Sequence, residues 1–302
     1  MPGTTRNRRR AAELCSEATG TPYRTCLNWA SQEMISRTLP VPDAATADQR
    51  TTESLMVCEL ADGLRESEQR GGALFGFTRA RPTRTGLLLG LHPATADRVL
   101  ALLLPRIDER YGGLRGVPGL RLVPHGRYWA LTRVQGNAVV HLAHPDAEWQ
   151  PELPVHGAGL TQLWRRNRHR LHPAESARLD DRTGTGGDAG RATAQDWLNS
   201  RLLRRPRLLG LAGAAHGAAN TYTHGSGQVV VEWCCGVERG DLERQLRASG
   251  LAVRPDGIRE HPRDRQTFTD RVAMGGAHVT LRKAVCAYPY ASAASASKAG
   301  PR

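Results

Sequence analysis

The sequence predicts an α+β fold, with an N-terminal three-helix unit followed by two small units, each built from a strand, a helix and a meander of strands. Three observations lead to this prediction. Apolar residues recur at helical spacing in residues 1–70, strand-like runs alternate with single helices in residues 71–150 and 211–290, and a stretch rich in Gly, Pro and Arg lies between those two segments. With 302 residues the chain is long enough for more than one compact unit.

The helical unit begins with a helix over residues 7–18, where apolar side chains recur at i, i+3, i+4 and i+7. Gly20 provides a stop for this helix, and the pair Thr21-Pro22 suits the start of a second one. A third helix is predicted over residues 45–69. This segment is acidic, and its carboxylates, Glu53 among them, are expected to face outward.

The first α+β unit is predicted over residues 71–150. It starts with a buried apolar strand at residues 86–91 and continues with a helix over residues 94–110. Three strand-like runs joined by turn residues follow and predict a meander at residues 120–123, 128–133 and 138–142. One helix on one face of such a sheet is typical of the α+β class.

The second unit, residues 211–290, repeats this order. A strand at residues 228–233 precedes a helix over 237–249, and further strands are predicted near residues 251–253, 267–272 and 278–285. The two units share no convincing residue identity, so an internal duplication is only a hypothesis at this point. Residues 151–210 are predicted to be a basic linker with a helix, and the Ala- and Ser-rich residues 291–302 a disordered tail.

The charge of the chain indicates the kind of partner. It carries 42 Lys+Arg and 29 Asp+Glu, which gives a formal net charge of +13. All basic residues except Lys283 and Lys298 are arginine, a skew expected of a GC-rich organism. The excess of base over acid is the stronger signal, because a positive field attracts polyanions, and nucleic acid is the commonest of these.

Several features favour the cytoplasm. No run approaches the ~18 apolar residues that a membrane span needs, and the N-terminal arginines precede Glu13 and Glu17 instead of the apolar core of a secretory signal. The six cysteines have no C-x-x-C spacing, which fits reduced thiols better than a disulfide framework or a structural zinc site. We therefore expect a cytoplasmic protein with no membrane contact, no metal and no cofactor.

The first two helices and their short turn have the pattern of a helix-turn-helix motif. Arg24 and Asn28 lie at i and i+4 on the second helix, opposite its apolar stripe, and such side chains are suited to guanine and adenine edges. Arg8, Arg9 and Arg10 are candidates for phosphate contacts. An ordinary helical hairpin with a polar exterior has the same pattern, so both interpretations stay open.

Two further arginine runs lie within the predicted linker segment. The first combines an aromatic ring for base stacking with four cations, at Trp164, Arg165, Arg166, Arg168 and Arg170. The second consists of Arg204, Arg205 and Arg207. Whether the two runs join into one surface for a polyanion stays open until the fold is known. The alternative is a solvated basic segment beside a helix.

An enzymatic alternative rests on Cys234 and Cys235, which lie where a predicted strand turns into a helix. A thiol at a helix N-terminus can have a lowered pKa and act as a nucleophile, and His224 is a nearby candidate base. Glu238 and Asp241 at the same helix start oppose that shift, and buried cysteines at the end of a core strand would have the same pattern. No nucleotide-binding G-x-x-x-x-G-K-[ST] sequence is present.

The pair of H-x-x-H spacings, at His141/His144 and His169/His172, is insufficient for a metal prediction. Zinc needs further ligands, and residues three apart on a strand point to opposite faces.

The sequence therefore predicts a cytoplasmic, non-enzymatic protein that binds nucleic acid, with DNA as the expected partner, or that acts as a regulator. Two alternatives stay open. One is a small enzyme with a cysteine nucleophile, and the other is a protein–protein interaction module that uses the acidic helix at residues 45–69. Assembly into a homo-oligomer also stays open.

Overall fold

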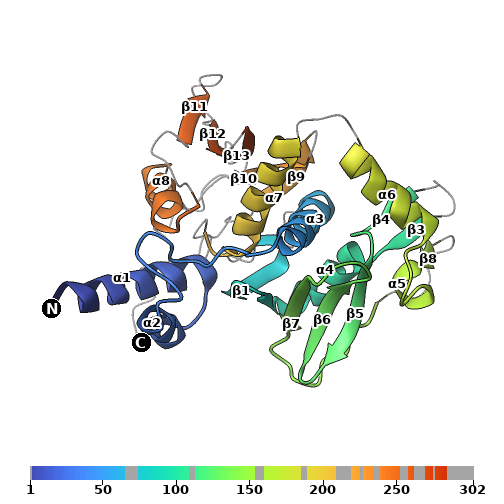
Figure 1. Cartoon of the computed structure of the whole chain (residues 1–302), viewed down its shortest axis with the longest axis horizontal. Helices are drawn as coiled ribbons and strands as arrows, with labels where there is room; N and C mark the ends of the chain where they lie inside the picture. Colours follow the sequence, from blue (N-terminus) through green and yellow to red (C-terminus); the bar gives the residue numbers. More distant parts are fainter. Residues whose placement is uncertain are drawn as a thin grey trace, which may run out of the picture.

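The computed structural model describes residues 2–64, 74–108, 113–153, 160–184, 189–208, 219–224, 227–233, 239–251, 258–261, 269–274 and 276–283. Within these ranges the protein has mixed helices and sheets, which confirms the predicted α+β class (Figure 1). Two sheets have five strands each and a third has three. None of the described helices combines the length and the apolar character that crossing a membrane requires.

Helices α1 (Pro2–Thr19) and α2 (Tyr23–Ser31) pack against each other as the predicted N-terminal pair. Gly20 ends α1 at φ 71°, and its N–H donates to the Ser16 carbonyl at 2.9 Å. A β-carbon at Gly20 would lie 2.7 Å from the Arg207 side chain and 2.8 Å from the Thr78 carbonyl oxygen. Only glycine therefore fits this turn, where the helix pair meets the rest of the molecule.

The pair has a small core of its own, formed by the buried residues Ala11, Ala12, Cys15, Cys26, Ala30 and Ile35. The neighbouring Cys26 thiol and burial together raise the pKa of Cys15. The buried residues of α1 begin only at Ala11. The first part of the helix consequently extends beyond its partner.

Helix α3 (Ala47–Gly63) lies in the middle of the molecule, packed along α7 (Ala189–Leu203) (Figure 1). Thr46 caps α3, because its hydroxyl accepts the N–H of Gln49 at 3.2 Å. Buried residues occur around most of the helix, since α7, α4 (Ala96–Leu103) and the second sheet all contact it. The third helix of the N-terminal region is thus the central helix of the whole protein.

The first five-stranded sheet has the order β1-β2-β7-β6-β5. Its strands are β1 (Phe77–Pro82), β2 (Leu87–Leu91), β5 (Leu120–His125), β6 (Tyr128–Arg133) and β7 (Val139–Ala143). Neighbouring strands are antiparallel, except that β2 and β7 run parallel. The parallel pair needs a crossover, which α4 provides.

The second five-stranded sheet has the order β9-β10-β13-β12-β11. Its strands are β9 (Ala219–His224), β10 (Gln228–Trp233), β11 (Ile258–His261), β12 (Thr269–Met274) and β13 (Ala277–Lys283). Here β10 and β13 form the one parallel pair, and α8 (Arg239–Ala248) lies between β10 and β11 in the chain. The two sheets therefore have the same topology: a hairpin, a helix and a three-stranded meander.

Helices α3 and α7 are the two central helices, and a matching contact joins each of them to one of the five-stranded sheets. Gln49 of α3 bonds both backbone groups of Val139 in β7, donating to the carbonyl at 3.2 Å and accepting the N–H at 3.0 Å. Gln195 of α7 makes the same two bonds with His278 in β13, both at 3.3 Å. Since β7 and β13 occupy equivalent places, this shared contact supports the duplication hypothesis at the level of structure.

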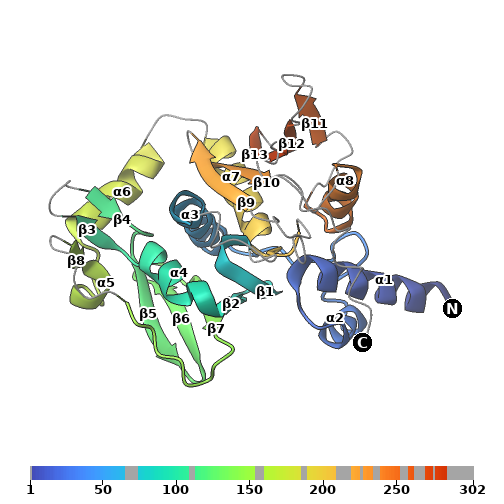
Figure 2. The same ribbon diagram turned by 180° about the vertical axis from the view of Figure 1, so that it is seen from behind.

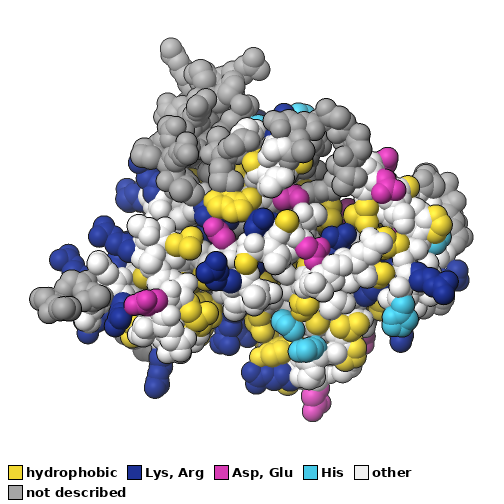
Figure 3. Space-filling model, in the orientation of Figure 1, with side chains coloured by type: hydrophobic (Ala, Val, Ile, Leu, Met, Phe, Trp, Pro, Cys, Tyr) yellow, Lys and Arg dark blue, Asp and Glu magenta, His cyan; other side chains and the backbone are white. Residues whose placement is uncertain are grey.

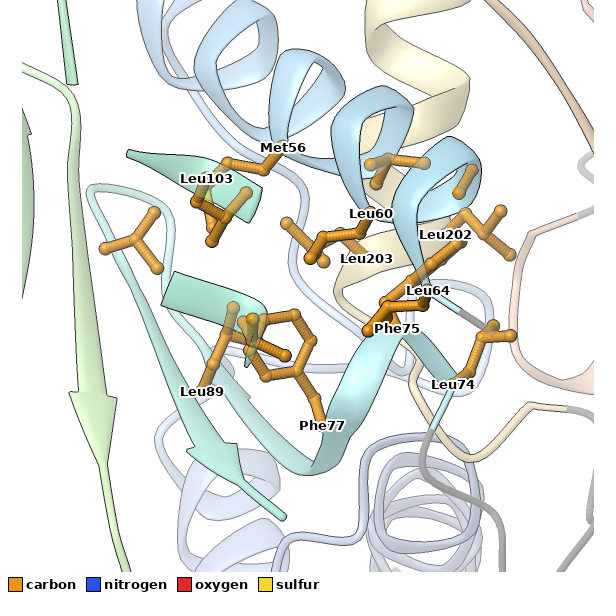
Figure 4. Close-up of a cluster of buried hydrophobic side chains, with 14 of the residues drawn as sticks. Met56, Leu60, Leu64, Leu74, Phe75, Phe77, Leu89, Leu103, Leu202 and Leu203 are labelled. Atoms are coloured by element: carbon orange, nitrogen blue, oxygen red, sulfur yellow. The ribbon is translucent and has the colours of Figure 1, made fainter. Parts of the chain in front are cut away.

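The main core joins both units through the central helices. Figure 4 shows Met56, Leu60 and Leu64 of α3 together with Leu202 and Leu203 of α7 and Phe77 and Leu89 of the first sheet. The inner face of the first sheet consists of alternate residues such as Leu87, Leu89, Val140 and Leu142. Burial of this alternating set fixes the register, because a slip by one residue would turn it to the solvent.

The segment between the two units folds back onto the first one. Strand β8 (Leu160–Gln162) pairs with β3 (Arg106–Asp108), which also pairs with β4 (Gly113–Arg115). Two helices follow, α5 (Leu163–Arg166) and α6 (Pro173–Gly184). The predicted basic linker thus contains regular elements as well as α7. The predicted tail at residues 291–302 lies outside the described residues.

Candidate nucleic-acid interface

The N-terminal half of α1 projects from the molecule (Figure 1). Every side chain from Thr5 to Arg10 is exposed, in contrast to the buried residues that begin at Ala11. The predicted phosphate contacts Arg8, Arg9 and Arg10 are therefore all on the surface. They point in different directions, because successive residues are about 100° apart around the helix axis.

One side of this helix borders an open hollow of about 820 Å³. Its lining residues are Thr5, Arg6, Asn7, Arg9, Arg10, Glu13 and Arg37. Four arginines thus face one carboxylate, and Arg10 forms an exposed ion pair with Glu13 at 3.0 Å. Within the described ranges Arg6, Arg9 and Arg37 form no ion pair. The lining of the hollow therefore carries several positive charges that no carboxylate of the described residues neutralises.

Arg37 is the member of this group that sequence reasoning missed. It follows α2 in a loop flanked by no other arginine, and nothing in its local sequence distinguishes it. The packing of α2 on α1 places it beside Arg6 and Arg9. Only the pairing of the two helices could have revealed this proximity.

The predicted base-reading residues of α2 lie on its exposed face. Arg24 and Asn28 are exposed, whereas Cys26 and Ala30 are buried against α1. A single helical turn separates the two exposed side chains, so they point in the same direction. This arrangement is compatible with a helix-turn-helix and with an ordinary hairpin alike, so base reading stays a prediction.

Arg204 and Arg205 correct the prediction made for the second arginine run, because both are completely buried. Arg204 donates to both carboxylate oxygens of Glu53, at 2.6 and 2.8 Å, and to two backbone carbonyls. Arg205 donates to the carbonyls of Arg201 and Ser249 at 2.8 and 3.0 Å. Burial, together with the charge of Arg201, lowers the pKa of Arg205 to about 9, which leaves it cationic at neutral pH. Neither residue can reach a phosphate.

Arg207 alone of that run is exposed. Its N–H donates to the Ala18 carbonyl at 3.1 Å, and its side chain lies against Gly20. It therefore belongs to the helix pair rather than to a surface made with Arg204 and Arg205.

The run from Trp164 to Arg170 lies at the opposite end of the molecule. Figures 1 and 2 place α5 far from α1 and α2. Arg165, Arg166, Arg168 and Arg170 are exposed, and the Arg165 guanidinium lies 4.7 Å from the centroid of the half-buried Trp164 ring. The two runs do not form one surface, because two of the three arginines of the second run are internal.

The acidic helix proposed as a protein contact is internal as well. Glu53, expected to face outward, is completely buried in α3, where it also accepts the Ser200 hydroxyl at 2.6 Å. Sequence patterns misplace it because the compensating charge, Arg204, lies 151 residues further along the chain. The outward acidic surface assumed for that alternative is correspondingly reduced.

The residues of the enzymatic alternative are only partly described. Cys234 and Cys235 lie outside the described residues, and His224 is exposed at the end of β9 opposite Gln228. The histidines of the first H-x-x-H pair have different neighbours. His141 lies 4.8 Å from the His125 ring, whereas His144 stacks on Trp149 at 4.6 Å. Among the described residues, no group of three or more candidate metal ligands is present.

No protein-family model, curated protein or solved structure matches this chain.

Proposed function

We propose that this is a cytoplasmic nucleic-acid-binding protein that contacts DNA through the helix pair α1 and α2. The observation that carries the proposal is the hollow lined by Arg6, Arg9, Arg10 and Arg37 beside a projecting helix. Guanidinium groups bind phosphate oxygens with two parallel hydrogen bonds, and three of the four have no carboxylate partner among the described residues.

The two helices of the pair have different proposed roles, because different kinds of side chain are exposed on each. The arginines of α1 would hold the phosphate backbone, which fixes position but carries no sequence information. Arg24 and Asn28 on the exposed face of α2 are suited to base edges in the major groove. Arg207, held against the turn at Gly20, adds one further cation beside the pair.

Fluorescence anisotropy with a labelled duplex across a salt series tests the proposal. Replacing Arg6, Arg9 and Arg10 with alanine should weaken binding and lower the slope of log affinity against log salt by about 1 for each phosphate that the variant no longer neutralises. The matched control replaces Arg165, Arg166 and Arg168, which removes the same charge at the other end of the molecule. An equal weakening in both triple variants would contradict a local interface and indicate unspecific attraction.

Base reading by α2 has a separate readout. Replacing Arg24 and Asn28 with alanine should reduce the preference between duplex sequences more than it reduces overall affinity, because base contacts discriminate and phosphate contacts do not. Selection from a random duplex library before and after the substitution measures this preference. An unchanged preference would remove the helix-turn-helix interpretation and leave the phosphate contacts in place.

A further inference from the structure

The first five-stranded sheet has an outer face, opposite the one that packs on α3 and α4. A row of directly paired residues crosses it, from Arg81 through Leu88, His141 and Ala130 to Val123. Val123 is 37% exposed, and the other side chains of this row are at least partly covered by their neighbours. Figure 3 shows histidine and hydrophobic side chains at the surface over β5, β6 and β7, with basic side chains close by.

This sheet carries positive charge without any compensating carboxylate of its own. Its five strands contain no Asp or Glu, whereas β1 places Arg79 and Arg81 on the outer face, opposite Gly90 and Leu88 of β2. The Arg79 side chain lies across Gly90, since a β-carbon there would be 2.5 Å from its Cγ. Within the described residues neither Arg79 nor Arg81 forms an ion pair.

Rings gather on the same face over β5, β6 and β7, towards the edge of the sheet opposite to β1. The His125 and His141 rings have centroids 4.8 Å apart, and Tyr128 lies directly opposite His125 in the register of β5 and β6. The Arg127 guanidinium lies 4.9 Å from the Tyr128 ring centroid. Three rings and the Arg127 cation therefore lie at this end of the face, and Arg79 and Arg81 lie at the other.

Two buried nitrogens on this face have no hydrogen-bond partner among the described residues. They are Nε of Arg81 and Nδ1 of His141. Buried polar atoms are nearly always paired, so both nitrogens have an unused capacity for a hydrogen bond.

The second sheet provides an internal comparison at one described place on its outer face. At the place equivalent to Gly90 it has Glu232, whose carboxylate accepts hydrogen bonds from Arg282, Asn220 and Tyr222 at 3.0, 3.1 and 3.2 Å. The same topology thus carries a closed polar network in one unit and free arginines in the other.

We propose that the outer face of the first sheet binds single-stranded nucleic acid. Arg79 and Arg81 would neutralise phosphates, and His125, His141 and Tyr128 would stack on two or three bases, as rings on an open sheet can do. The inference is tested separately from the duplex interface, because Arg79 of β1 lies against the turn of the helix pair at Gly20. A second copy of this chain fits poorly, because its net charge of +13 would oppose the approach of another positive face.

The test uses the full-length protein and a fluorescent single-stranded oligonucleotide of about 12 nucleotides, at about 50 mM salt. The double variant R79A/R81A should bind it about tenfold more weakly, with duplex affinity changed far less. The matched control R244A/R282A removes two exposed arginines of the second unit and should leave binding almost unchanged. Equal affinity of R79A/R81A and the unaltered protein for the single strand would overturn the proposal.

Two further measurements guard against a folding defect and against plain charge attraction. The variant R79K/R81K keeps the charge and should bind within about threefold of the unaltered protein. A tenfold loss of affinity in this variant, with an unchanged circular dichroism spectrum, would show that binding requires the planar guanidinium groups and not the charge alone. Photo-crosslinking of a bromouracil-containing single strand should label the peptides of β5 and β6 that carry His125 and Tyr128. The proposal would be overturned if the crosslinks were confined to residues 2–37 or 160–170. It would also be overturned if polyglutamate displaced the single strand at an equal concentration of charge.

The two interfaces fail independently. Loss of duplex binding in the α1 triple variant, with single-strand binding retained, supports the separation of the two surfaces. Loss of single-strand binding in that variant, with none in R79A/R81A, would assign both ligands to the helix pair and overturn the inference drawn here.

Discussion

The two five-stranded units share a topology but use different polar partners at corresponding places. In each, a glutamine of the central helix forms hydrogen bonds with the backbone of the middle strand of the sheet, β7 or β13. Its amide also donates to the residue four positions later in the helix. That residue is Glu53 in the first unit and Asn199 in the second. The helix-to-strand contact is thus common to both units, whereas the charge that accompanies it belongs to one of them.

The difference teaches how a repeated fold accommodates an asymmetric core. Glu53 is buried because Arg204, which directly follows α7, pairs with it. Asn199, being neutral, needs only hydrogen bonds, and it donates to the Gly227 carbonyl at 3.0 Å and to the Ser54 hydroxyl at 3.1 Å. One cross-unit ion pair therefore locks the two central helices in one arrangement.

The largest effect is expected from breaking this ion pair. Glu53→Gln should lower the free energy of unfolding by about 3–5 kcal/mol, because it leaves the buried Arg204 charge without its partner. Asn199→Ala, at the corresponding place, should cost only about 1–3 kcal/mol. Urea unfolding followed by circular dichroism measures both. Equal losses of stability would contradict the asymmetry, and the double variant E53Q/R204M should recover part of the first loss.

A pH-dependent effect is expected from a contact of the first unit that has no counterpart among the described residues of the second. Arg121 of β5 donates to both oxygens of the buried Glu175 at 3.0 Å. Burial would raise the pKa of Glu175, but the bonds from Arg121 and from the N–H groups of His172 and Gly119 outweigh it and hold the pKa below 4.5. This carboxylate therefore stabilises the fold above its unfolded-state pKa, and the contribution is lost as the pH falls through the lower folded-state value.

Glu175→Gln should accordingly cost about 1.5–3 kcal/mol near neutral pH and progressively less in acid. Unfolding free energies measured from about pH 7 down to pH 3 should therefore fall less steeply for the variant than for the unaltered protein. Parallel curves would show that the ion pair adds nothing to folding.

The smallest and most symmetrical effect concerns the two glutamines. Gln49→Ala and Gln195→Ala each remove one pair of helix-to-strand hydrogen bonds, and each should cost about 1–2 kcal/mol. Thermal unfolding of the two variants under identical conditions measures the difference between them. A loss of stability confined to one variant would mean that the matching contacts do not play the same structural part in the two units.

Sequence patterns located many of the elements because they depend on local spacing. The strand at residues 228–233 and the helix pair with its stop at Gly20 agree with β10, α1 and α2. The helix expected over residues 94–110 ends earlier, at Leu103, and Pro105 precedes a short strand. Proline cannot continue the helical hydrogen bonds, so the end of this helix could have been predicted from the sequence.

Some residues of the candidate interface could likewise be predicted from local spacing, and others could not. The exposure of Arg8, Arg9, Arg10, Arg24 and Asn28 agrees with their helical positions. Arg37, Arg79 and Arg81 were beyond local reasoning, since their importance arises from the neighbours that other segments bring to them. The fate of Arg204 and Arg205 was beyond it for the same reason.

The sequence by itself determined the class of fold, the repeated order of strands and helix, and the excess of positive charge. The tertiary structure decided which charges remain free. A charged side chain can be buried only if another group supplies an opposite charge or several hydrogen bonds, and here those groups come from residues as distant as Glu53 and Arg204. Local spacing cannot encode such a partner, so only the folded chain separates the arginines that hold the core from those that face the solvent.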